Sequence, residues 1–452
     1  MNMLRAAIDY YHALLTDETA GQTQAMINEQ LLRQGLYFGN RPLTTVLRPR
    51  FFTRGQYRFI CRTMRPILSA FRKAHDAALV DPTFRAQFGL TEREEELFLL
   101  DPGFPDPSPT ARMDTFFLPE TGELFLTEYN AETPAAPAYN DALAQAFLGL
   151  PVMHTFEKKY EVQWLPARHH MLHVILENYR HWGGIGRPTI AILDWREVPT
   201  YSEFVLFQQY FSFHGYHCII TDPRQVEYKN GKLWTDTGVQ IDFIYKRVLI
   251  SELLGQGGFN HPVIQAVRDH AVCMVNPFRC KALYKKASLA ALSDDQNHHL
   301  FDKAEVHAIQ SHIPWTRLLS EQQTAYENRQ IDLIPFLRDN KDQFVIKPND
   351  DYGGRGIVLG WTVDQMDWEH ALQVGIKNPT VVQKRIPLPS EPYPSLNNGN
   401  VEFFDRLFDT APFIWHGDFV SSSLTRLSTD PLLNVTAGGG STVPTFIIEE
   451  RE

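Results

Sequence analysis

The sequence predicts a mixed α/β protein (α+β in its arrangement) made of several lobes. Its 452 residues are too many for one simple core. Helical and strand-like patterns alternate along the chain, which predicts units of different architecture. The composition, 43% hydrophobic and 21% charged, is that of an ordinary globular protein, so no fibrous or disordered class is expected.

Charge and cysteine content narrow the class of protein further. The formal net charge of −10 argues against a general nucleic-acid binder, which needs a basic face. Cys61, Cys218, Cys273 and Cys280 form no C-x-x-C pair, which favours a reducing compartment. The first residues, "MNMLRAAIDYYHALLTDE", are amphipathic and too broken by charge for a signal peptide or a membrane anchor. We therefore expect a cytoplasmic protein.

Residues 1–100 are expected to form a helical N-terminal region. Apolar residues recur at helical spacing in Leu4–Leu15 and again in Tyr57–Leu79. The connection "GNRPLTTVLRPRFFTRGQ" between them is basic and broken by proline. Its arginines could meet phosphate or carboxylate, but a solvated linker is the favoured interpretation.

A β-hairpin is predicted in "ARMDTFFLPETGELFLTEYN", because "PETG" is typical of a turn. A loop of three or five residues places Asp114 opposite Glu128 and Arg112 opposite Asn130, all on one sheet face. A loop of four places them on opposite faces. Carboxylate and amide oxygens on one face suit Mg²⁺ shared with substrate phosphates. The alternative is a solvated face with a cross-strand ion pair, and the hairpin alone leaves both open.

After a helical stretch at 140–180, the chain returns to alternating strands and helices. "RPTIAILDW", "YSEFVLFQQYFSFHG" and "HCIITDP" are typical of a βαβ unit, and a hairpin with Asn230-Gly231 at its turn follows. We expect a separate α/β domain at 181–275. His169 and His173 have the spacing of a zinc-binding pair, but the glutamate of H-E-x-x-H is missing, so structural histidines are favoured.

The stretch "FVIKPNDDYGGRGIVLGWT" carries Lys347 at the end of an apolar strand, directly before a glycine-rich loop. This arrangement is typical of a phosphate-binding element. It is no P-loop, since the chain has no G-x-x-x-x-G-K-[ST]. The cluster Gly183–Gly186 precedes its strand, which excludes the dinucleotide fingerprint. Near the end of the chain, a hydroxyl run with Arg426, Asn434 and Gly438–Gly440 fits a second anion-facing loop, although an ordinary surface turn is favoured.

Taken together, five segments resemble the ATP-grasp ligases: "RMD…EYNAE", "CKALYKKASLAAL", "FVIKPNDDYGGRGI", "VVQKRI" and "TRLS…N…GGG". The E-x-N strand precedes the lysines, an order that resembles the circularly permuted branch containing eukaryotic glutathione synthetase and the glutathionylspermidine synthetase domain. The resemblance implies a circularly permuted ATP-grasp fold. Its first part, with a metal-binding hairpin, would span 101–180. Its second part, with a glycine-rich lid, would span 276–452, and 181–275 would be an inserted substrate-type domain.

The resemblance also implies roles for individual residues. Metal ligands would be Asp114, Glu128, Asn130 and Asp351. Nucleotide contacts would come from Lys347, Lys286 (or its neighbour Lys285), the closing loop of Gly353, Gly354 and Gly356, and the adenine hinge of Val382, Gln383, Lys384 and Ile386. The family hinge commonly has Glu where Lys384 stands. Arg112 would stabilise the transferring phosphoryl group, and Arg426 is a candidate substrate contact.

The implied activity is an ADP-forming carboxylate–amine ligase similar to glutathionylspermidine synthase, which uses ATP and Mg²⁺ and forms an amide through an acyl phosphate. The chain has no G-x-S-x-G elbow, and this chemistry needs no nucleophilic side chain. The alternatives are an inactive ATP- or ADP-binding scaffold or regulatory protein, and a kinase that stops at the phosphorylated acid. Expected partners are small-molecule or peptide acids and amines, with a homodimer as a candidate and with no nucleic acid or membrane.

Overall fold

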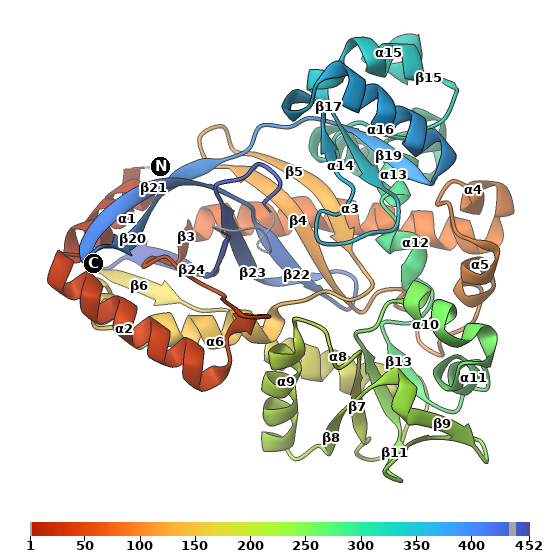
Figure 1. Ribbon diagram of the computed structural model, residues 1–452, viewed down its shortest axis with the longest axis horizontal. Helices are drawn as coiled ribbons and strands as arrows, with labels where there is room; N and C mark the ends of the chain where they lie inside the picture. Colours follow the sequence, from red (N-terminus) through yellow and green to blue (C-terminus); the bar gives the residue numbers. More distant parts are fainter. Residues whose placement is uncertain (1, 434–439) are drawn as a thin grey trace.

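The computed structural model describes residues 2–433 and 440–452, and Figure 1 shows their arrangement. Three units, each built on a sheet, make up the molecule: a large mixed sheet, a parallel α/β unit and a smaller antiparallel unit. The mixed helix-and-sheet class expected from the sequence is confirmed. In Figure 1 the α/β unit lies below the large sheet and the antiparallel unit lies above its right-hand end.

The large sheet joins strands from both ends of the chain. Its main order is β20-β21-β23-β22-β4-β5, and β24 pairs with β23, β3 and β6. The strands are β3 (Arg50–Thr53), β4 (Thr110–Leu118), β5 (Glu123–Asn130), β6 (Tyr160–Gln163), β20 (Ser390–Asn397), β21 (Asn400–Phe408), β22 (Ala411–Trp415), β23 (Phe419–Ser428) and β24 (Ser441–Glu450). Because β22 pairs with β4, the N-terminal hairpin and the C-terminal strands form one continuous surface.

The long helix α3 (Arg54–Val80) covers one face of the β4–β5 hairpin. It begins at a capping box in which Thr53 and Gln56 satisfy each other's backbone N–H groups. Its apolar side shares a core with Met113 and Tyr129 of the hairpin. Since side chains alternate along a strand, the even-numbered residues at this end of β4 point to the opposite face. Polar side chains of the hairpin can therefore form a site on that opposite face.

The N-terminal helix α1 (Asn2–Leu14) lies at the left-hand end of the large sheet in Figure 1, and α2 (Asp17–Gln34) runs from there toward the α/β unit, where the Gly39 N–H after α2 donates to the Pro199 carbonyl at 3.0 Å. Helix α6 (Pro137–Leu148) follows the hairpin and is buried along most of its length. Helix α8 (Arg168–His181) packs against α6 and β22. These helices supply the core on the side of the sheet away from α3.

The α/β unit has four parallel strands in the order β13-β12-β7-β8. They are β7 (Ile190–Leu193), β8 (Cys218–Thr221), β12 (Phe243–Lys246) and β13 (Cys273–Val275), with α9 (Tyr201–Phe213) connecting the first pair. The expected Asn-Gly turn joins β9 (Val226–Lys229) to β10 (Lys232–Thr235), with Asn230 and Gly231 both at positive φ.

Asn276 connects the α/β unit to the β4–β5 hairpin. It follows β13, and its side-chain amide donates to the carbonyls of Thr110 and Ala131, both at 2.7 Å, and accepts from the Thr110 N–H at 3.1 Å. Thr110 begins β4, and Ala131 directly follows β5. One buried side chain therefore holds the open end of the hairpin against the α/β unit.

The antiparallel unit contains the strand order β14-β19-β17-β18. Its strands are β14 (Thr316–Leu318), β17 (Phe344–Pro348), β18 (Val358–Leu359) and β19 (Thr380–Lys384), and helices α15 (Leu333–Asp339) and α16 (Gln365–Lys377) cover one face. Trp368 of α16 is fully buried in the core between them. The short helices α12 (Cys280–Tyr284) and α13 (Ala287–Ser293) precede this unit in the chain.

The basic connection at residues 39–56 is not a solvated linker, so that interpretation was wrong. Arg48 and Arg50 are completely buried. Both pair with Glu391 of β20, Arg48 at 2.7 Å. Their guanidinium groups also lie over the rings of Tyr393 and Phe408, each at 4.1 Å. The arginines meet a carboxylate from the other end of the chain, which ties β20 and β21 to the N-terminal region.

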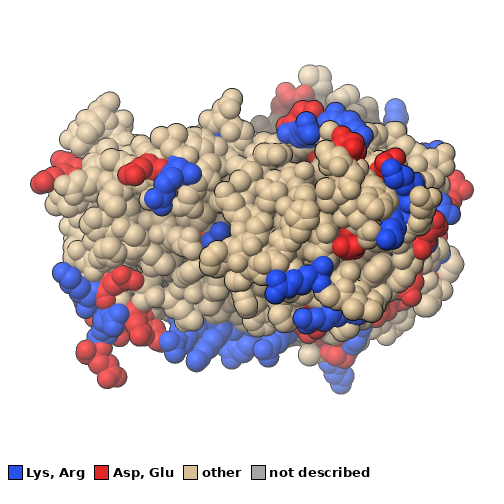
Figure 2. Space-filling view, turned by 90° about the horizontal axis from the view of Figure 1, so that it is seen from below, with Lys and Arg blue, Asp and Glu red and all other residues tan. Residues whose placement is uncertain are grey.

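Figure 2 views the molecule from below and shows a mostly uncharged face with Lys, Arg, Asp and Glu gathered toward its margins. Within the described residues, no helix is both long enough and apolar enough to cross a membrane.

The pairing of Glu391 with two buried arginines predicts a large loss of stability in Glu391→Ala. Removing the carboxylate leaves two guanidinium groups buried without their counter-charge, a loss of about 3–5 kcal/mol. Thermal denaturation measures it. Glu449→Ala is the control, because its pair with Arg54 is exposed and is worth at most about 1 kcal/mol. Equal melting temperatures for the two variants would contradict the role of Glu391.

Candidate functional site

A β-bulge sets which residues of the hairpin share a face. Leu118 pairs with Glu123, so the loop has four residues, the length for which simple alternation would place the predicted pairs on opposite faces. Between the turn and the predicted site, however, the register shifts: Thr115 pairs with Leu126, but Asp114 pairs with Glu128. Thr127 is the extra residue. The bulge therefore restores the expected pairs, Asp114 with Glu128 and Arg112 with Asn130.

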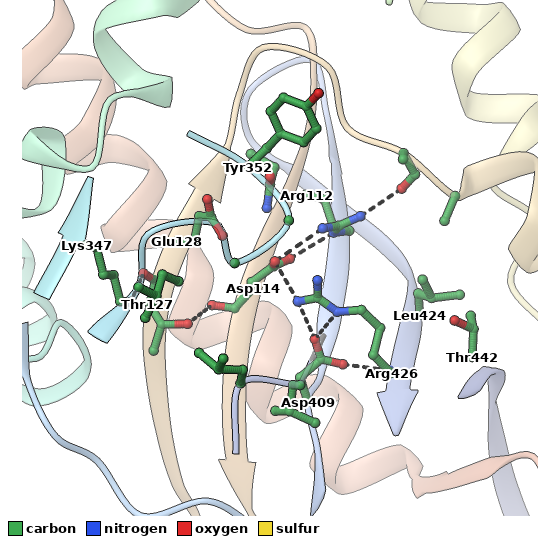
Figure 3. A pocket seen from close by; sticks show the side chains of 18 of the residues that line it. Arg112, Asp114, Thr127, Glu128, Lys347, Tyr352, Asp409, Leu424, Arg426 and Thr442 are labelled. Carbon is green, nitrogen blue, oxygen red and sulfur yellow. Dashed lines mark hydrogen bonds and ion pairs between the residues drawn. The ribbon is translucent and has the colours of Figure 1, made fainter. Parts of the chain in front are cut away.

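Asp114 lies between two arginines at the centre of the site (Figure 3). Arg112 donates to both of its oxygens, at 2.8 and 3.2 Å, and Arg426 of β23 donates to it at 2.6 Å. Arg426 also pairs with Asp409 at 2.6 Å. Burial by itself would raise the pKa of Asp114, but the two guanidinium groups outweigh it and hold that pKa well below its ordinary value. Asp114 therefore holds the guanidinium groups of Arg112 and Arg426 in place, and both of its carboxylate oxygens are already hydrogen-bonded.

Glu128 distinguishes the two adjacent lysines that follow α12. The Lys286 ammonium pairs with the Glu128 carboxylate at 3.0 Å and donates to the Asp351 carbonyl at 2.7 Å. Lys285 points elsewhere, into a buried network with Glu94 at 3.0 Å and Asp350 at 2.8 Å. Of the two lysines, Lys286 is the one that the structure places beside the hairpin.

Glu128 and Asn130 are two predicted metal ligands that face the same open space beside the hairpin. Both line the cavity described below, and the Asn130 amide nitrogen is buried without a hydrogen-bond partner. The unpartnered amide N–H group is a donor, so it indicates a ligand with an acceptor such as a phosphate oxygen, whereas the Asn130 side-chain oxygen is the atom that would contact a cation. Asp351 is not brought to them: its carboxylate accepts from the Tyr352 N–H at 2.8 Å, and it does not line the cavity.

Lys347 ends β17 and points toward the hairpin (Figure 3). Its ammonium donates to the Gln383 side chain at 2.7 Å and to the Thr127 carbonyl at 3.2 Å. Both partners are neutral. Burial of the ammonium, with a smaller contribution from Lys286, lowers the pKa of Lys347 to about 8, although Glu128 opposes the shift. Lys347 is mostly buried, and it lines the cavity.

The glycine-rich loop adopts a backbone that favours glycine. Gly353, Gly354 and Gly356 have φ of 67°, 75° and 67°. At Gly356 a Cβ atom would lie 2.8 Å from the Pro348 ring, so a side chain there would clash as well. Gly353 and Gly354 line the cavity, whereas Gly356 does not. Tyr352, at the tip of this loop, reaches over the site in Figure 3.

The predicted adenine hinge lies on β19, beside Lys347. Gln383, Lys384 and Ile386 line the cavity, but Val382 is buried in the core of the antiparallel unit. Lys384 pairs with Glu327 at 2.8 Å, and the hydrogen bond to Glu327 is the main reason that the pKa of Lys384 is raised. A glutamate is thus present at the hinge, supplied by another segment.

The cavity that these residues line has a volume of about 400 Å³, the size of a small-molecule site. It reaches from the antiparallel unit, across the hairpin, to the carboxyl ends of two parallel strands. There Asp194 follows β7 and Arg247 follows β12. Burial raises the pKa of Asp194 to about 7, with Arg247 opposing the shift.

Asp194 and Arg247 were missed in the sequence. Their positions in the sequence could have identified them, because each directly follows a predicted parallel strand, and ligands bind beyond the carboxyl ends of such strands. Asp409, the second partner of Arg426, was also missed, and no sequence pattern marks it. Within the second anion-facing loop, Asn434, Gly438 and Gly439 lie outside the described residues.

No protein-family model and no curated protein matches this sequence. Among solved structures, a glutathione synthetase-like effector from Globodera pallida is similar over 94% of this chain and 96% of its own, at 11% identity and a TM-score of 0.59. A RimK domain protein ATP-grasp from Sphaerobacter thermophilus covers 57% of this chain and 90% of its own, at 12% identity and a TM-score of 0.28. D-alanyl-alanine synthetase A from Vibrio cholerae covers 59% and 89%, at 10% identity and a TM-score of 0.26. Only the first likeness is strong enough to use, and it establishes the fold alone.

The lowered pKa of Lys347 predicts that the affinity for a phosphate-bearing ligand, measured with ATP, falls as the pH rises through about 8. Phosphate beside the ammonium favours its charged form, so binding raises the pKa and takes up a proton. The dissociation constant should be nearly constant below about pH 7. Above the pKa of Lys347 it should rise by up to roughly tenfold per pH unit. Calorimetry in a pH series measures it.

Two variants separate Lys347 from other groups. Lys347→Arg keeps its charge over this range and should flatten the pH dependence. Lys384→Ala should keep it, because the pKa of Lys384 is shifted upward, away from this range. A parent protein whose ATP affinity does not change from about pH 7 to about pH 9.5 would refute the assignment of Lys347.

Proposed function

We propose that this chain is an ADP-forming carboxylate–amine ligase of the ATP-grasp type, with the circularly permuted order of the glutathionylspermidine synthase-like branch. ATP would phosphorylate a carboxylate, and an amine would attack the acyl phosphate to form an amide. The order of the elements supports the permutation, because the β4–β5 hairpin precedes β17 and β19 in the chain. The fold likeness to a glutathione synthetase-like effector supports the general class.

The observation that carries the proposal is the charge of Lys347. In the described part of the chain, its ammonium has no carboxylate within ion-pair distance, although the cavity around it contains Glu128 and Asp114. A buried cation held by two neutral oxygens has charge left for an anionic ligand. Glu128 and Asn130 lie across the same cavity. A phosphate with an associated cation satisfies both sides at once.

The remaining residues divide into binding and transfer roles. Glu128 and Asn130 would hold Mg²⁺, which, when bound, offsets the charge of the nucleotide phosphates. Lys347 and Lys286 would bind phosphate oxygens, and the loop at Gly353 and Gly354 would exclude water above them. Arg112 faces the same side of the hairpin and would stabilise the phosphoryl group in transfer.

The far end of the cavity suits the acid and amine substrates. Arg247 has a buried Nε without a partner, which could bind a substrate carboxylate. Asp194 has a pKa of about 7, so it could take the proton that an attacking ammonium must lose. These roles rest on the position of both residues at the strand ends of the α/β unit.

A second candidate, a nucleotide-binding scaffold without ligase activity, is favoured by one observation. Lys286 already neutralises Glu128, and Arg112 already neutralises Asp114. Because these charges already neutralise one another within the protein, the site depends less on a substrate to balance them. Such a protein would bind ATP but would not turn it over.

A screen for ADP release tests the function. The protein is incubated with ATP, Mg²⁺ and panels of amino acids, peptides and polyamines, and amide products are sought by mass spectrometry. The ligase should release ADP only when both an acid and an amine are present. ADP with the acid alone indicates a kinase, and ATP binding without ADP from any pair supports the scaffold. Glu128→Gln, which removes one metal-binding charge, should lose turnover and keep its melting temperature.

Arg112→Ala separates catalysis from structure. If Arg112 acts on the phosphoryl group in flight, kcat should fall by about 100-fold or more while ATP affinity changes far less. Asp114 would still be held by Arg426, so the hairpin should stay folded. If the Arg112–Asp114 pair is only structural, the melting temperature and metal binding should fall together while kcat is kept. Measuring all three quantities on this variant distinguishes the outcomes.

A further inference from the structure

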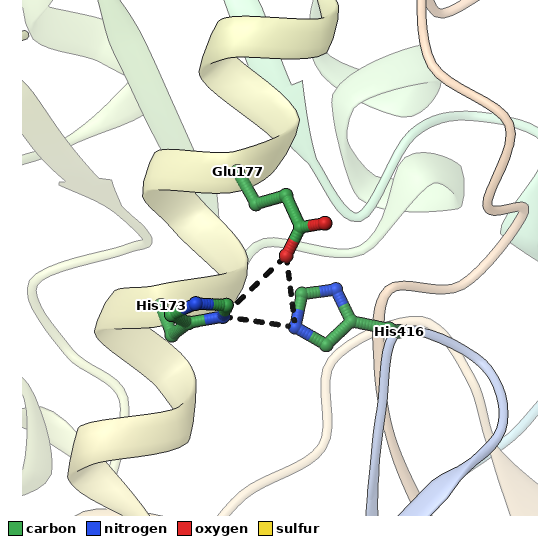
Figure 4. A group of neighbouring side chains, drawn as sticks. All are labelled: His173, Glu177 and His416. Atoms are coloured by element: carbon green, nitrogen blue, oxygen red, sulfur yellow. Dashed lines mark hydrogen bonds and ion pairs between the residues drawn. The ribbon is translucent and has the colours of Figure 1, made fainter.

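Three potential metal ligands converge on a surface site outside the cavity (Figure 4). His173 and Glu177 stand one turn apart on α8, and His416 projects from the turn between β22 and β23. His173 Nδ1 lies 3.3 Å from His416 Nε2 and 3.4 Å from Glu177 Oε2, and His416 Nε2 lies 3.5 Å from the same oxygen. The three atoms form a nearly equilateral triangle.

The size of this triangle matches a tetrahedral metal site. Zinc binds imidazole nitrogen and carboxylate oxygen at about 2.0–2.2 Å. Two ligands of a regular tetrahedron are about 1.63 times that distance apart, which gives about 3.3–3.6 Å. All three observed separations, 3.3, 3.4 and 3.5 Å, fall in this range. A single ion could contact all three ligand atoms without moving them.

Rigid elements hold the ligands in place. On α8, the neighbouring residues Val174 and Asn178 are buried, so the helix presents His173 and Glu177 outward from a fixed position. His416 has a φ of 53°, a left-handed conformation in which few non-glycine residues occur, and its N–H donates to the Pro109 carbonyl at 2.8 Å. The strained turn aims the imidazole at the helix.

The charges of the cluster point to a cation. Among the ion pairs found in residues 2–433 and 440–452, Glu177 pairs only with the two imidazoles. His173 is exposed and Glu177 is partly exposed, so one side of the triangle opens to solvent. Two imidazoles and a carboxylate are a ligand set for zinc and related transition metals, and they suit Mg²⁺ poorly.

We propose that His173, Glu177 and His416 bind one transition-metal ion of the zinc class, which fastens the β22–β23 turn to α8 and leaves a fourth position open to solvent. The site is separate from the proposed ligase function, since none of its residues lines the cavity. It is coupled to the hairpin through β22, whose Phe413 pairs with Arg112 and whose Trp415 pairs with Thr110. The metal would stiffen the strand beside the predicted transfer residue.

The test measures zinc binding to the full chain after treatment with a chelator. Calorimetry should find one Zn²⁺ per chain with high affinity. At a Zn²⁺ concentration about 100 times the dissociation constant, the melting temperature should rise by about 3 °C for a chain of this length. Mg²⁺ at the same concentration should cause no such rise.

Variants assign the site. His416→Asn removes the imidazole while keeping a residue that tolerates the left-handed backbone, and Glu177→Gln removes the carboxylate charge. Each should weaken Zn²⁺ binding by roughly tenfold or more. Their melting temperatures without zinc should match that of the zinc-free parent. His169→Asn is the matched control: it is an exposed histidine one turn earlier on α8, and it should bind zinc like the parent.

Three results would overturn the proposal. One is a parent protein that binds no zinc. Another is zinc binding that persists unchanged in Glu177→Gln and in His416→Asn. The last is an equal loss in His169→Asn, which would show diffuse binding to surface histidines. If His416→Asn lowers the melting temperature without zinc, the result for Glu177→Gln alone decides.

Discussion

The extra residue at Thr127 determines what the hairpin can present. With the register of the turn carried through the whole hairpin, Glu128 would lie opposite Met113 and would face the apolar side of α3. The bulge shifts the strand by one residue, so Glu128 and Asn130 face the cavity while Tyr129 joins Leu124 and Leu126 in the core. The bulge also takes the Thr127 carbonyl out of the strand pairing, and this carbonyl accepts a hydrogen bond from the Lys347 ammonium. Both the oxygen ligands and the orientation of the lysine depend on this one residue.

Beyond the hairpin, the site is organised by which charges are satisfied and which are not. Lys281 and Lys285 share Asp350 and Glu94 in a buried network that has no surplus positive charge to offer a ligand. Asp114 is matched by Arg112 and Arg426. Lys347 is different, because its partners are an amide oxygen and a carbonyl. Its lowered pKa is the thermodynamic sign of that difference.

Local patterns predicted the elements well, and distant contacts explain what they missed. Alternation along the hairpin identified the face of Asp114 and Glu128, but the bulge that produces it is not encoded in the turn. The adjacent residues Lys285 and Lys286 look alike in sequence, and only their distant partners separate them: Glu94 and Asp350 bind Lys285, and Glu128 binds Lys286. Arg48 and Arg50 looked solvated because Glu391 lies more than three hundred residues away. Spacing paired His169 with His173, whereas the structure pairs His173 with His416, from a strand turn far along the chain.

The Asn276 side chain, which bonds to the first residue of β4 and the residue after β5, has a consequence for how this architecture can diversify. The α/β unit supplies one edge of the cavity, so exchanging it is a direct way to alter what the cavity accepts. Any exchange that moves the junction past Asn276 would release the open end of the hairpin, because it removes the Asn276 hydrogen bonds to the two carbonyls at its base. A transplanted unit must therefore bring its own asparagine, or join the host chain before it. The boundary of the exchangeable segment is set by this one amide.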